Sequence, residues 1–315
     1  MSGIAQTRIF APQMEAVKAA YLRMHIAVLL FGFTGILGKL ISVDGFGVTW
    51  WRILLTVASF LVWPGMVKKA LALPPQVRWK LAGIGVLVAL HWATFFGAIA
   101  MTNASVTLAM LASIAFFTAI LEPLITGSKF KWYELALGCT VIPGVILIKN
   151  STDFPLIGIA TALFSALCSA VFSVLNKVMV AKHDAATMTF VELASGFGFM
   201  TLLLPFVLLL DDSPKFVPQG WDFLYLPILA WLCTTVAYVL SLRSLEHLST
   251  FTSNLTINLE PIYTILIAWL LLGEDKELHA GFYIGAAVII GSVFLHPFLT
   301  RWLEPRPAPA SEDAD

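Results

Sequence analysis

The chain has 315 residues, of which 59% are hydrophobic and 12% charged, against roughly 45–50% and about 25% in an average soluble domain. Nineteen Lys and Arg residues balance nineteen Asp and Glu residues. This composition excludes a disordered chain, a nucleic-acid binder that depends on net charge, and nearly every water-soluble globular fold. A polytopic membrane protein remains.

Ten stretches are candidates to cross a membrane as helices, each of which needs about 20 mostly apolar residues. Their apolar runs are continuous rather than alternating, which favours helices over the strands of a barrel. We expect an all-α fold with spans at 22–42, 46–66, 81–101, 106–126, 133–148, 157–180, 187–210, 223–243, 250–272 and 279–299. Residues 1–21 then form an N-terminal segment, 149–156 an external linker and 300–315 a disordered tail.

The basic residues predict the orientation of these spans. With the N-terminus in the cytoplasm, 14 Lys and Arg residues fall on the inner side and 4 on the outer side. Short cytoplasmic loops are enriched in Lys and Arg. We therefore expect a multi-pass protein of the plasma membrane with both termini in the cytoplasm.

The second half of the chain echoes the first at an offset of about 138 to 147 residues. Leu37-Gly38-Lys39 matches Leu175-Asn176-Lys177, and Gly138 and Gly144 match Gly285 and Gly291. Each half, 22–148 and 157–299, has five expected spans, so the halves would enter the membrane from opposite sides. Such inverted repeats build transporters whose substrate site lies where the halves meet. The alternative is that similar apolar segments align by chance.

Several local patterns carry a resemblance. They are Arg52 in span two, Leu-His-Trp at 90–92, Leu-Glu-Pro-Ile at 259–262, Leu-Leu-Leu-Gly-Glu at 270–274 and Ile-Gly-Ala-Ala-Val-Ile-Ile-Gly at 284–291. With these residues the chain resembles, over about 22–298, the EamA branch of the drug/metabolite transporter superfamily. The resemblance implies a ten-helix transporter, often an exporter of amino acids or related metabolites, with a cavity lined by spans one, three, four, six, eight and nine. The first half departs from the pattern, since Ser128 rather than an acid follows Gly127.

Span nine carries the candidate cargo-binding carboxylate. Glu260 lies in its middle, directly before Pro261, which removes a helix hydrogen bond and predicts a kink. Asn254 and Asn258 share a neighbouring helix face. Because a charge inside the membrane costs roughly 2.5–3.5 kcal/mol on insertion scales, Glu260 needs a reason to be there. We interpret it as a cavity contact, the alternative being a packing role between helices.

Four further ionisable residues are candidates for gates. Arg52 and Glu192 occupy matching repeat positions near opposite faces of the membrane, as do Lys39 and Lys177. Lys177 and Glu192 could pair at the inner mouth, while Arg52 and Lys39 make the outer mouth basic. The alternative is that the lysines snorkel to the interface. Glu122, at the inner end of span four, is interpreted as a surface partner of Lys129 or Lys131.

Aromatic side chains and one imidazole complete the candidate binding residues. His91 and Trp92 lie near the middle of span three, and Trp231 and Tyr238 lie in span eight. A mid-membrane imidazole can relay protons, and an indole offers a flat face for an aromatic or cationic cargo. The alternatives are a hydrogen-bonded core histidine and packing aromatics.

The sequence has no Walker loop, HExxH, GxSxG or Cys/His cluster, so it predicts no ATP hydrolysis, metal or cofactor. We expect a secondary transporter, not an enzyme, that exports small metabolites such as amino acids or amines as a monomer or weak homodimer in the lipid bilayer, without nucleic acid. A nucleotide-sugar or phosphorylated-metabolite transporter is one alternative. A membrane enzyme or receptor-like scaffold is an alternative of another class.

Overall fold

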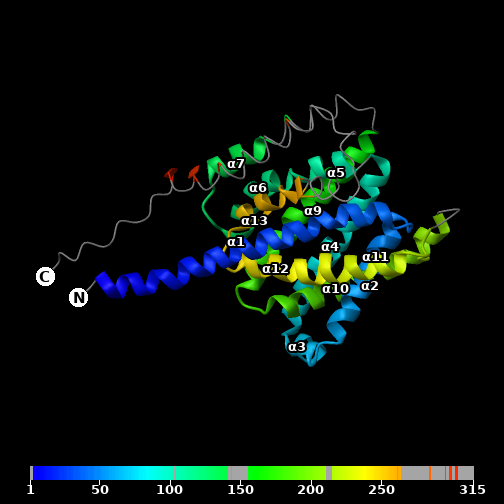
Figure 1. Cartoon of the computed structure of the whole chain (residues 1–315), viewed down its shortest axis with the longest axis horizontal. Coiled ribbons are helices and arrows are strands. Elements are labelled where there is room, and N and C mark those ends of the chain that lie inside the picture. Colours follow the sequence, from blue (N-terminus) through cyan, green and yellow to red (C-terminus); the bar gives the residue numbers. More distant parts are fainter. Residues whose placement is uncertain are drawn as a thin grey trace.

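The computed structural model describes residues 3–102, 104–140, 143, 155–210, 215–260, 262–263, 284, 295, 298–299 and 302–303. All regular elements within these ranges are helices (Figure 1). The first half contains α1 (Gly3–Leu40), α2 (Gly45–Leu61), α3 (Met66–Ala72), α4 (Pro75–Met101), α5 (Ala104–Leu111), α6 (Ile114–Thr126) and α7 (Trp132–Cys139). The second half contains α9 (Leu156–Val180), α10 (Ala185–Leu210), α11 (Asp222–Ala230), the π-helix η1 (Trp231–Val236), α12 (Ala237–Leu245) and α13 (Thr250–Ile257).

Five of these helical segments are long and apolar enough to cross a membrane, namely Glu15–Gly38, Pro75–Met101, Leu156–Val180, Ala185–Leu210 and Asp222–Leu245. A sixth span is possible if α2 and α3, bent by 96° against each other, count as one. Spans one, two, three, six, seven and eight of the predicted set therefore have helical counterparts. The later parts of the expected spans 133–148 and 250–272, and most of 279–299, lie outside the described residues.

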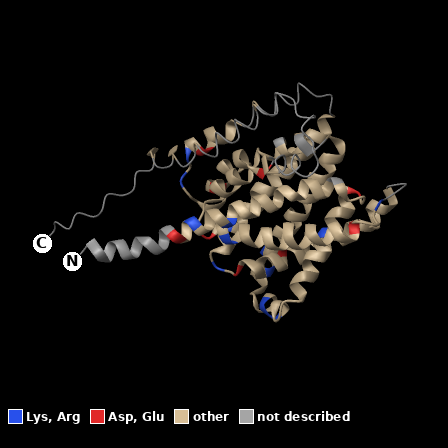
Figure 2. Cartoon of the chain, in the orientation of Figure 1, with Lys and Arg blue, Asp and Glu red and all other residues tan. Residues whose placement is uncertain are grey.

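Exposed tryptophans mark the ends of several of these helices. Trp63 follows α2, Trp79 lies in the first turns of α4, and Trp221 precedes α11; their exposures are 52%, 79% and 71%. Exposed indole rings at helix ends are typical of the two membrane interfaces. Lys and Arg residues, blue in Figure 2, gather at the end of the bundle where α1 enters and around α3, whereas the middle of the bundle is mostly uncharged.

Two predicted spans are broken rather than continuous. Span four divides into α5 and α6 around Ala112 and Ser113, and span nine loses its regular helix after Ile257. The carbonyl of Ile257 is the one that Pro261 cannot bond, so the break lies where the sequence predicts a kink. Pro261 itself lies outside the described residues. Discontinuous helices of this kind border the substrate sites of many transporters.

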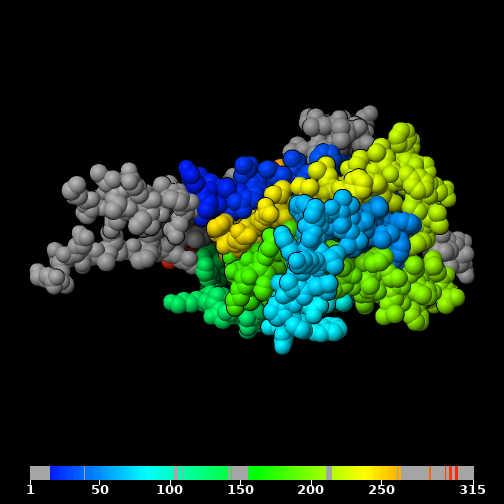
Figure 3. Space-filling model, turned by 90° about the horizontal axis from the view of Figure 1, so that it is seen from below, coloured from blue at the N-terminus to red at the C-terminus, as the bar shows by residue number. Residues whose placement is uncertain are grey.

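The two halves of the chain interleave. Helix α4 packs against α9 and α10, α1 packs against α12, and α6 packs against α9 and α13. Figure 3 shows first-half segments, in blue to cyan, beside second-half segments, in green to yellow, across one face. A Cβ on Gly85 would lie 1.9 Å from the carbonyl oxygen of Glu192, so the backbones of α4 and α10 touch there. Small residues allow such close approach between helices in a membrane.

Candidate functional site

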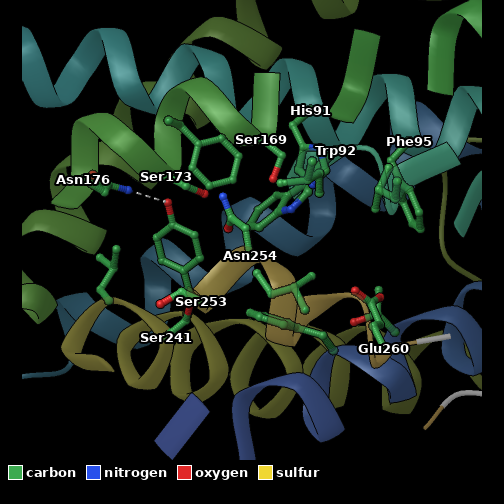
Figure 4. A pocket seen from close by; sticks show the side chains of 18 of the residues that line it. His91, Trp92, Phe95, Ser169, Ser173, Asn176, Ser241, Ser253, Asn254 and Glu260 are labelled. Carbon is green, nitrogen blue, oxygen red and sulfur yellow. Dashed lines mark hydrogen bonds between the residues drawn. The ribbon is translucent and has the colours of Figure 1, made fainter. Parts of the chain in front are cut away.

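A cavity lies where the two halves meet. It leaves about 80 Å³ for the centres of water-sized molecules, which is room for several waters. Its described lining comes from α1, α2, α4, α5, α6, α9, α12 and α13, with Glu260 beyond the end of α13. Figure 4 shows the labelled side chains around this space, with Asn176 at one end of the view and Glu260 at the other. The lining helices include all six spans that the family resemblance implied, together with Arg52 of span two.

Arg52 provides the positive charge of this cavity. The side chain is only 3% exposed. Its Nε donates to Thr234 Oγ1 over 2.6 Å, and its Nη2 donates to the Cys233 carbonyl over 3.4 Å. Its Cζ lies 4.2 Å from the centre of the Trp92 ring, which is a cation–π distance. Arg52 therefore lies inside the cavity wall and not at the outer mouth, where the sequence placed it.

The π-helix η1 shapes the partner surface for Arg52. Thr234 Oγ1 donates to the Leu229 carbonyl five residues back, over 2.8 Å, and Thr235 Oγ1 reaches Ala230 in the same way, over 3.1 Å. Such π-turns widen a helix and are frequent at functional sites. One turn after Arg52 on α2, Thr56 makes a second contact with this region. Its Oγ1 donates to the carbonyl of Ala230, directly before η1, over 3.1 Å. The polar face of α2 is thus bound to the widened turn of the second half.

His91 lines the cavity and is hydrogen-bonded into α9. Its Nδ1 lies 2.8 Å from Ser165 Oγ and 3.0 Å from the Ser165 carbonyl oxygen, and Ser165 Oγ also donates to the His91 carbonyl over 2.8 Å. The ring packs edge-on against Phe172, with 5.6 Å between centroids. This geometry is that of a histidine that joins two helices, the second of the two sequence interpretations.

Helix α13 brings polar side chains to the opposite wall. Ser253, Asn254 and Glu260 line the cavity. Asn254 Nδ2 donates to Thr118 Oγ1 of α6 over 2.8 Å. Glu260 carries the charge opposite to that of Arg52, and both residues line the same cavity. Asn258 is not among the lining residues; its amide is buried and bonds the Ala112 carbonyl of the other broken helix.

Two cavity hydroxyls are left without a partner. Thr34 Oγ1 on α1 and Ser253 Oγ on α13 are buried and make no hydrogen bond to any residue that the structure describes. A buried hydroxyl without a partner costs free energy. These two atoms are therefore available to a polar group of a bound molecule, and sequence reasoning did not select them because isolated Ser and Thr residues are common in membrane helices.

Tyr238 joins the cavity to a buried polar cluster. Its hydroxyl donates to Glu192 Oε2 over 2.9 Å, and Asn176 Nδ2 lies 3.2 Å from the Tyr238 oxygen and 3.3 Å from Glu192 Oε2. Asn176 and Tyr238 line the cavity, whereas Glu192 is fully buried behind them. Figure 4 marks the bond from Asn176 to the tyrosine hydroxyl.

The ion pair expected between Lys177 and Glu192 is not formed among these described side chains. Lys177 Nζ donates to the carbonyls of Leu245, at short range, and Leu248, over 2.8 Å. Glu192 instead bonds Tyr238 and Asn176. The carbonyls of Leu245, the last residue of α12, and of Leu248, in the α12–α13 turn, accept from the ammonium group, so the lysine joins α9 to this turn.

Trp231 also differs from its predicted role. Its side chain is 51% exposed on the outside of the bundle, and its indole N–H donates to the Leu55 carbonyl over 3.2 Å. Trp92, by contrast, is buried in the cavity wall. The side chain of Lys39 lies outside the described residues. Whether a tryptophan faces the cavity, as Trp92 does, or the outside, as Trp231 does, depends on how its helix is rotated about its axis. The packing of neighbouring helices sets that rotation.

Glu122 has a different partner from the one expected. Its two carboxylate oxygens accept hydrogen bonds from the backbone N–H groups of Thr250 and Phe251, over 3.1 and 3.0 Å. These N–H groups begin α13 and have no partner inside the helix. A carboxylate at a helix N-terminus is favourable for its charge as well. Glu122 is thus a clamp between α6 and α13, and not a surface partner of Lys129 or Lys131.

A second clamp joins the halves at another turn. Asp222, at the start of α11, accepts hydrogen bonds from the backbone N–H of Ser42 over 2.9 Å and from the Ser42 hydroxyl over 2.5 Å. It also accepts from the Gln219 N–H over 2.9 Å. Ser42 lies in the α1–α2 turn. A carboxylate at the edge of an apolar run was the one feature of the sequence that pointed to this contact.

Comparison with known proteins identifies the family. The model of the EamA-like transporter family matches the chain twice, over residues 18–149 and 156–296. The chain belongs to the EamA-like transporter family. The two matches confirm the predicted internal duplication and the resemblance to the drug/metabolite transporter superfamily. The protein is therefore a multi-pass membrane protein of a transporter family rather than of an enzyme family.

Two relatives carry matching descriptions. The chain is 28% identical over 265 residues to an uncharacterized transporter of Archaeoglobus fulgidus, covering 81% of this chain and 88% of the relative. It is 23% identical over 297 residues to an uncharacterized transporter of Clostridium kluyveri, covering 89% and 91%. A crystal structure that is 17% identical superposes with a TM-score of 0.67 over 91% of this chain and 99% of that chain. At this identity the superposition shows a shared fold and not a shared cargo.

Proposed function

We propose that this EamA-family protein is a secondary transporter that exports amino acids or related amines across the plasma membrane by alternating access. The single observation that carries the proposal is a cavity between the two halves whose wall holds both Arg52 and Glu260. We further propose ten spans in two inverted repeats, 22–148 and 157–299, with both termini in the cytoplasm.

The two charges suit a zwitterion. Arg52 offers a guanidinium for the carboxylate of the cargo, and Glu260 offers a carboxylate for its ammonium group. The free hydroxyls of Thr34 and Ser253 can hydrogen-bond polar atoms of the same molecule. The face of Trp92, already beside Arg52, lines the wall for an apolar side chain. Few polar groups in a mostly apolar pocket are typical of small-molecule sites.

A phosphorylated cargo fits this lining less well. Phosphate groups are usually bound by clusters of Arg and Lys. Among the described residues that line the cavity, Arg52 is the one with a permanent positive charge. Glu260 would repel a phosphate. A nucleotide sugar therefore remains as the alternative outcome of the binding experiment.

The two carboxylate clamps provide candidate gates. Glu122 and Lys177 hold the α12–α13 turn from the first and second halves, and Asp222 of the second half holds the α1–α2 turn. Under the proposed orientation, the contacts of Glu122 and Lys177 close the cytoplasmic side of the cavity, and the contact of Asp222 closes its external side. Alternating access requires that these contacts break in turn, and each consists of hydrogen bonds to backbone at a helix end, which water can replace.

A thermal-shift screen of the purified protein in detergent tests the cargo class. The compounds screened are amino acids, amines, nucleosides and sugar nucleotides. A ligand at 100 times its Kd should stabilise the protein by about 2.7 kcal/mol. We expect stabilisation by an amino acid or amine, lost in Glu260→Gln and retained in Glu246→Gln, which changes an exposed carboxylate. Stabilisation by sugar nucleotides alone would overturn the proposed cargo.

Reconstitution then tests transport itself. Liposomes containing the protein should exchange internal and external labelled cargo, and Glu260→Gln should lower this exchange while the folded yield is unchanged. Wild-type flux in a well-folded Glu260→Gln protein would contradict the assigned role of this residue. Release of the cargo from cells that express the protein, compared with cells that express Glu260→Gln, tests the outward direction.

A further inference from the structure

A buried carboxylate of the second half has no role in the proposed cargo site. Glu192 lies on α10 and is fully buried. Its Oε2 accepts from the Tyr238 hydroxyl and from Asn176 Nδ2. Its Oε1 makes no hydrogen bond within the part of the chain that the structure describes, and the same is true of Asn176 Oδ1. The cluster thus contains two buried acceptor oxygens and no donor for either.

One proton would satisfy both oxygens. A protonated carboxyl group has one O–H donor, while its other oxygen remains an acceptor. A carboxylic acid and a primary amide that share one hydrogen bond can close a ring with a second, from the acid O–H to the amide oxygen. Asn176 Nδ2 and Glu192 Oε2 already supply the first bond, over 3.3 Å. The unpaired oxygens, Glu192 Oε1 and Asn176 Oδ1, are the two atoms that the second bond requires.

The charges around Glu192 also favour its neutral form. A buried carboxylate without a cation costs several kcal/mol. The titratable groups on the elements that pack against α10, and on α9, have other partners or lie in solvent-facing positions. Arg52 on α2 is held by Thr234, His91 on α4 by Ser165, and Lys177 on α9 by Leu245 and Leu248. Lys68, Lys69, Lys80 and Arg243 are exposed. Two groups are exceptions: Arg78 on α4 lines a separate groove beside Phe190 and its Nε has no partner among the described residues, and Cys168 on α9 is a buried free thiol.

Position connects this group to the transport pathway. Asn176 and Tyr238 line the cavity and separate it from Glu192. The tyrosine hydroxyl, between the cavity and the carboxyl group, can pass a proton in either direction. Gly85 packs directly on the backbone of Glu192, which places this residue at the contact between the two halves. A movement of one half against the other would change this environment first.

We propose that Glu192 is a proton-binding site that exchanges its proton with the central cavity through Tyr238 and couples cargo movement to the proton gradient. The proposal rests on the proposed transport function. In the described state Glu192 carries the proton on Oε1, bonded to Asn176. When the halves move and water reaches the cluster, the carboxyl group turns so that its O–H donates to the Tyr238 oxygen in place of Asn176. The tyrosine then gives its own proton to water and takes up the carboxyl proton, so that Tyr238 is restored and the carboxylate of Glu192 remains.

Infrared difference spectroscopy of the full-length protein in lipid tests the proton site without any cargo. A protonated carboxyl group has a carbonyl-stretch band separate from that of a carboxylate. At neutral pH we expect the wild-type protein to show such a band with a component that is lost in Glu192→Gln. The matched control is Glu134→Gln, another buried glutamate, which lies 3.5 Å from Lys131 and should leave the band unchanged. An unchanged band in Glu192→Gln would overturn the proposal.

A second variant guards against misfolding of Glu192→Gln. Tyr238→Phe keeps the ring and removes the hydroxyl that donates to Oε2. We expect the Glu192 component to move to higher frequency in this variant, because its carbonyl loses a hydrogen bond. A band that does not move would show that the protonated group lies elsewhere, and would overturn the assignment to Glu192.

Flux measurements in liposomes test the coupling, with labelled phenylalanine as the probe. At one proton per cargo, a pH difference of one unit should drive about tenfold accumulation. Glu192→Gln should lose this accumulation but keep the exchange of internal for external phenylalanine, and Glu134→Gln should keep both. Undiminished accumulation in Glu192→Gln, or accumulation that follows a sodium gradient instead, would overturn the proposal. If the wild-type protein exchanges no phenylalanine, the proposed cargo class fails for this probe, whereas the infrared result still decides the proton site.

Discussion

The amide nitrogen of Asn258 donates a hydrogen bond to the carbonyl oxygen of Ala112 over 3.2 Å. The two residues are 146 positions apart, within the offset that relates the two halves. Both lie where a predicted span is broken, Ala112 between α5 and α6 and Asn258 after α13. A broken helix leaves carbonyls unsatisfied, and here the second half supplies the donor for a carbonyl of the first.

Replacement of Asn258 by Leu should therefore destabilise the protein. A buried acceptor left without its donor costs about 1–3 kcal/mol. We expect a lower midpoint of thermal unfolding in detergent, together with reduced cargo exchange, because the two broken helices border the cavity. Thr161→Ala is the control, since within the described part of the chain the exposed hydroxyl of Thr161 bonds the Ile157 carbonyl of its own helix and no other residue. Equal unfolding midpoints for wild type and Asn258→Leu would contradict this account.

Gly85 should tolerate no side chain. A Cβ there would lie 1.9 Å from the Glu192 carbonyl oxygen, whereas a Cβ on Gly83, in the same helix, would meet no described atom within 4 Å outside its own helix backbone and chain neighbours. Overpacking costs about 1–3 kcal/mol and sometimes more. We expect Gly85→Val to lose most of its folded yield in size-exclusion chromatography and Gly83→Val to keep it. Similar yields for the two variants would show that α4 and α10 are further apart.

The two tryptophans that the sequence treated alike should behave differently. Trp92 lines the cavity beside Arg52, and Trp231 faces outward. We expect Trp92→Ala to weaken cargo binding several-fold in the thermal-shift titration, because the cation–π contact is worth about 0.5–2 kcal/mol and the ring forms part of the wall. Trp231→Ala should leave the binding curve unchanged. Loss of binding in Trp231→Ala alone would invalidate the described cavity.

Removal of a clamp should open one side of the protein. In a variant whose native cysteines are replaced by alanine, Ser173→Cys places a thiol on the cavity wall. We expect Glu122→Ala to speed its reaction with a membrane-impermeant thiol reagent applied from the cytoplasmic side. Asp222→Ala should speed the reaction from the external side. Faster labelling from the same side in both variants would show that the clamps do not close opposite ends.

Composition and hydropathy were sufficient for the class of protein. Apolar runs such as 157–180 must form helices in lipid because no water is present to satisfy their backbone, and α9 spans Leu156–Val180. The helix break before Pro261 could also be predicted, since it depends on a missing N–H in the chain itself. Polar residues inside spans likewise marked His91 and Glu260 as candidate cavity residues, and Arg52 as a functional residue although at the outer mouth, because a charge or imidazole is costly in a membrane.

Only the tertiary structure decided the partners of these residues. The sequence did not distinguish Trp92 from Trp231, or show that Lys177 would bond two carbonyls and Glu192 a tyrosine. Helix rotation and long-range contacts fix these pairings, and both arise from the packing of many apolar side chains that are chemically alike. Hydropathy is a property of each segment alone, whereas a hydrogen bond between α10 and α12 depends on the distance that all their neighbours impose.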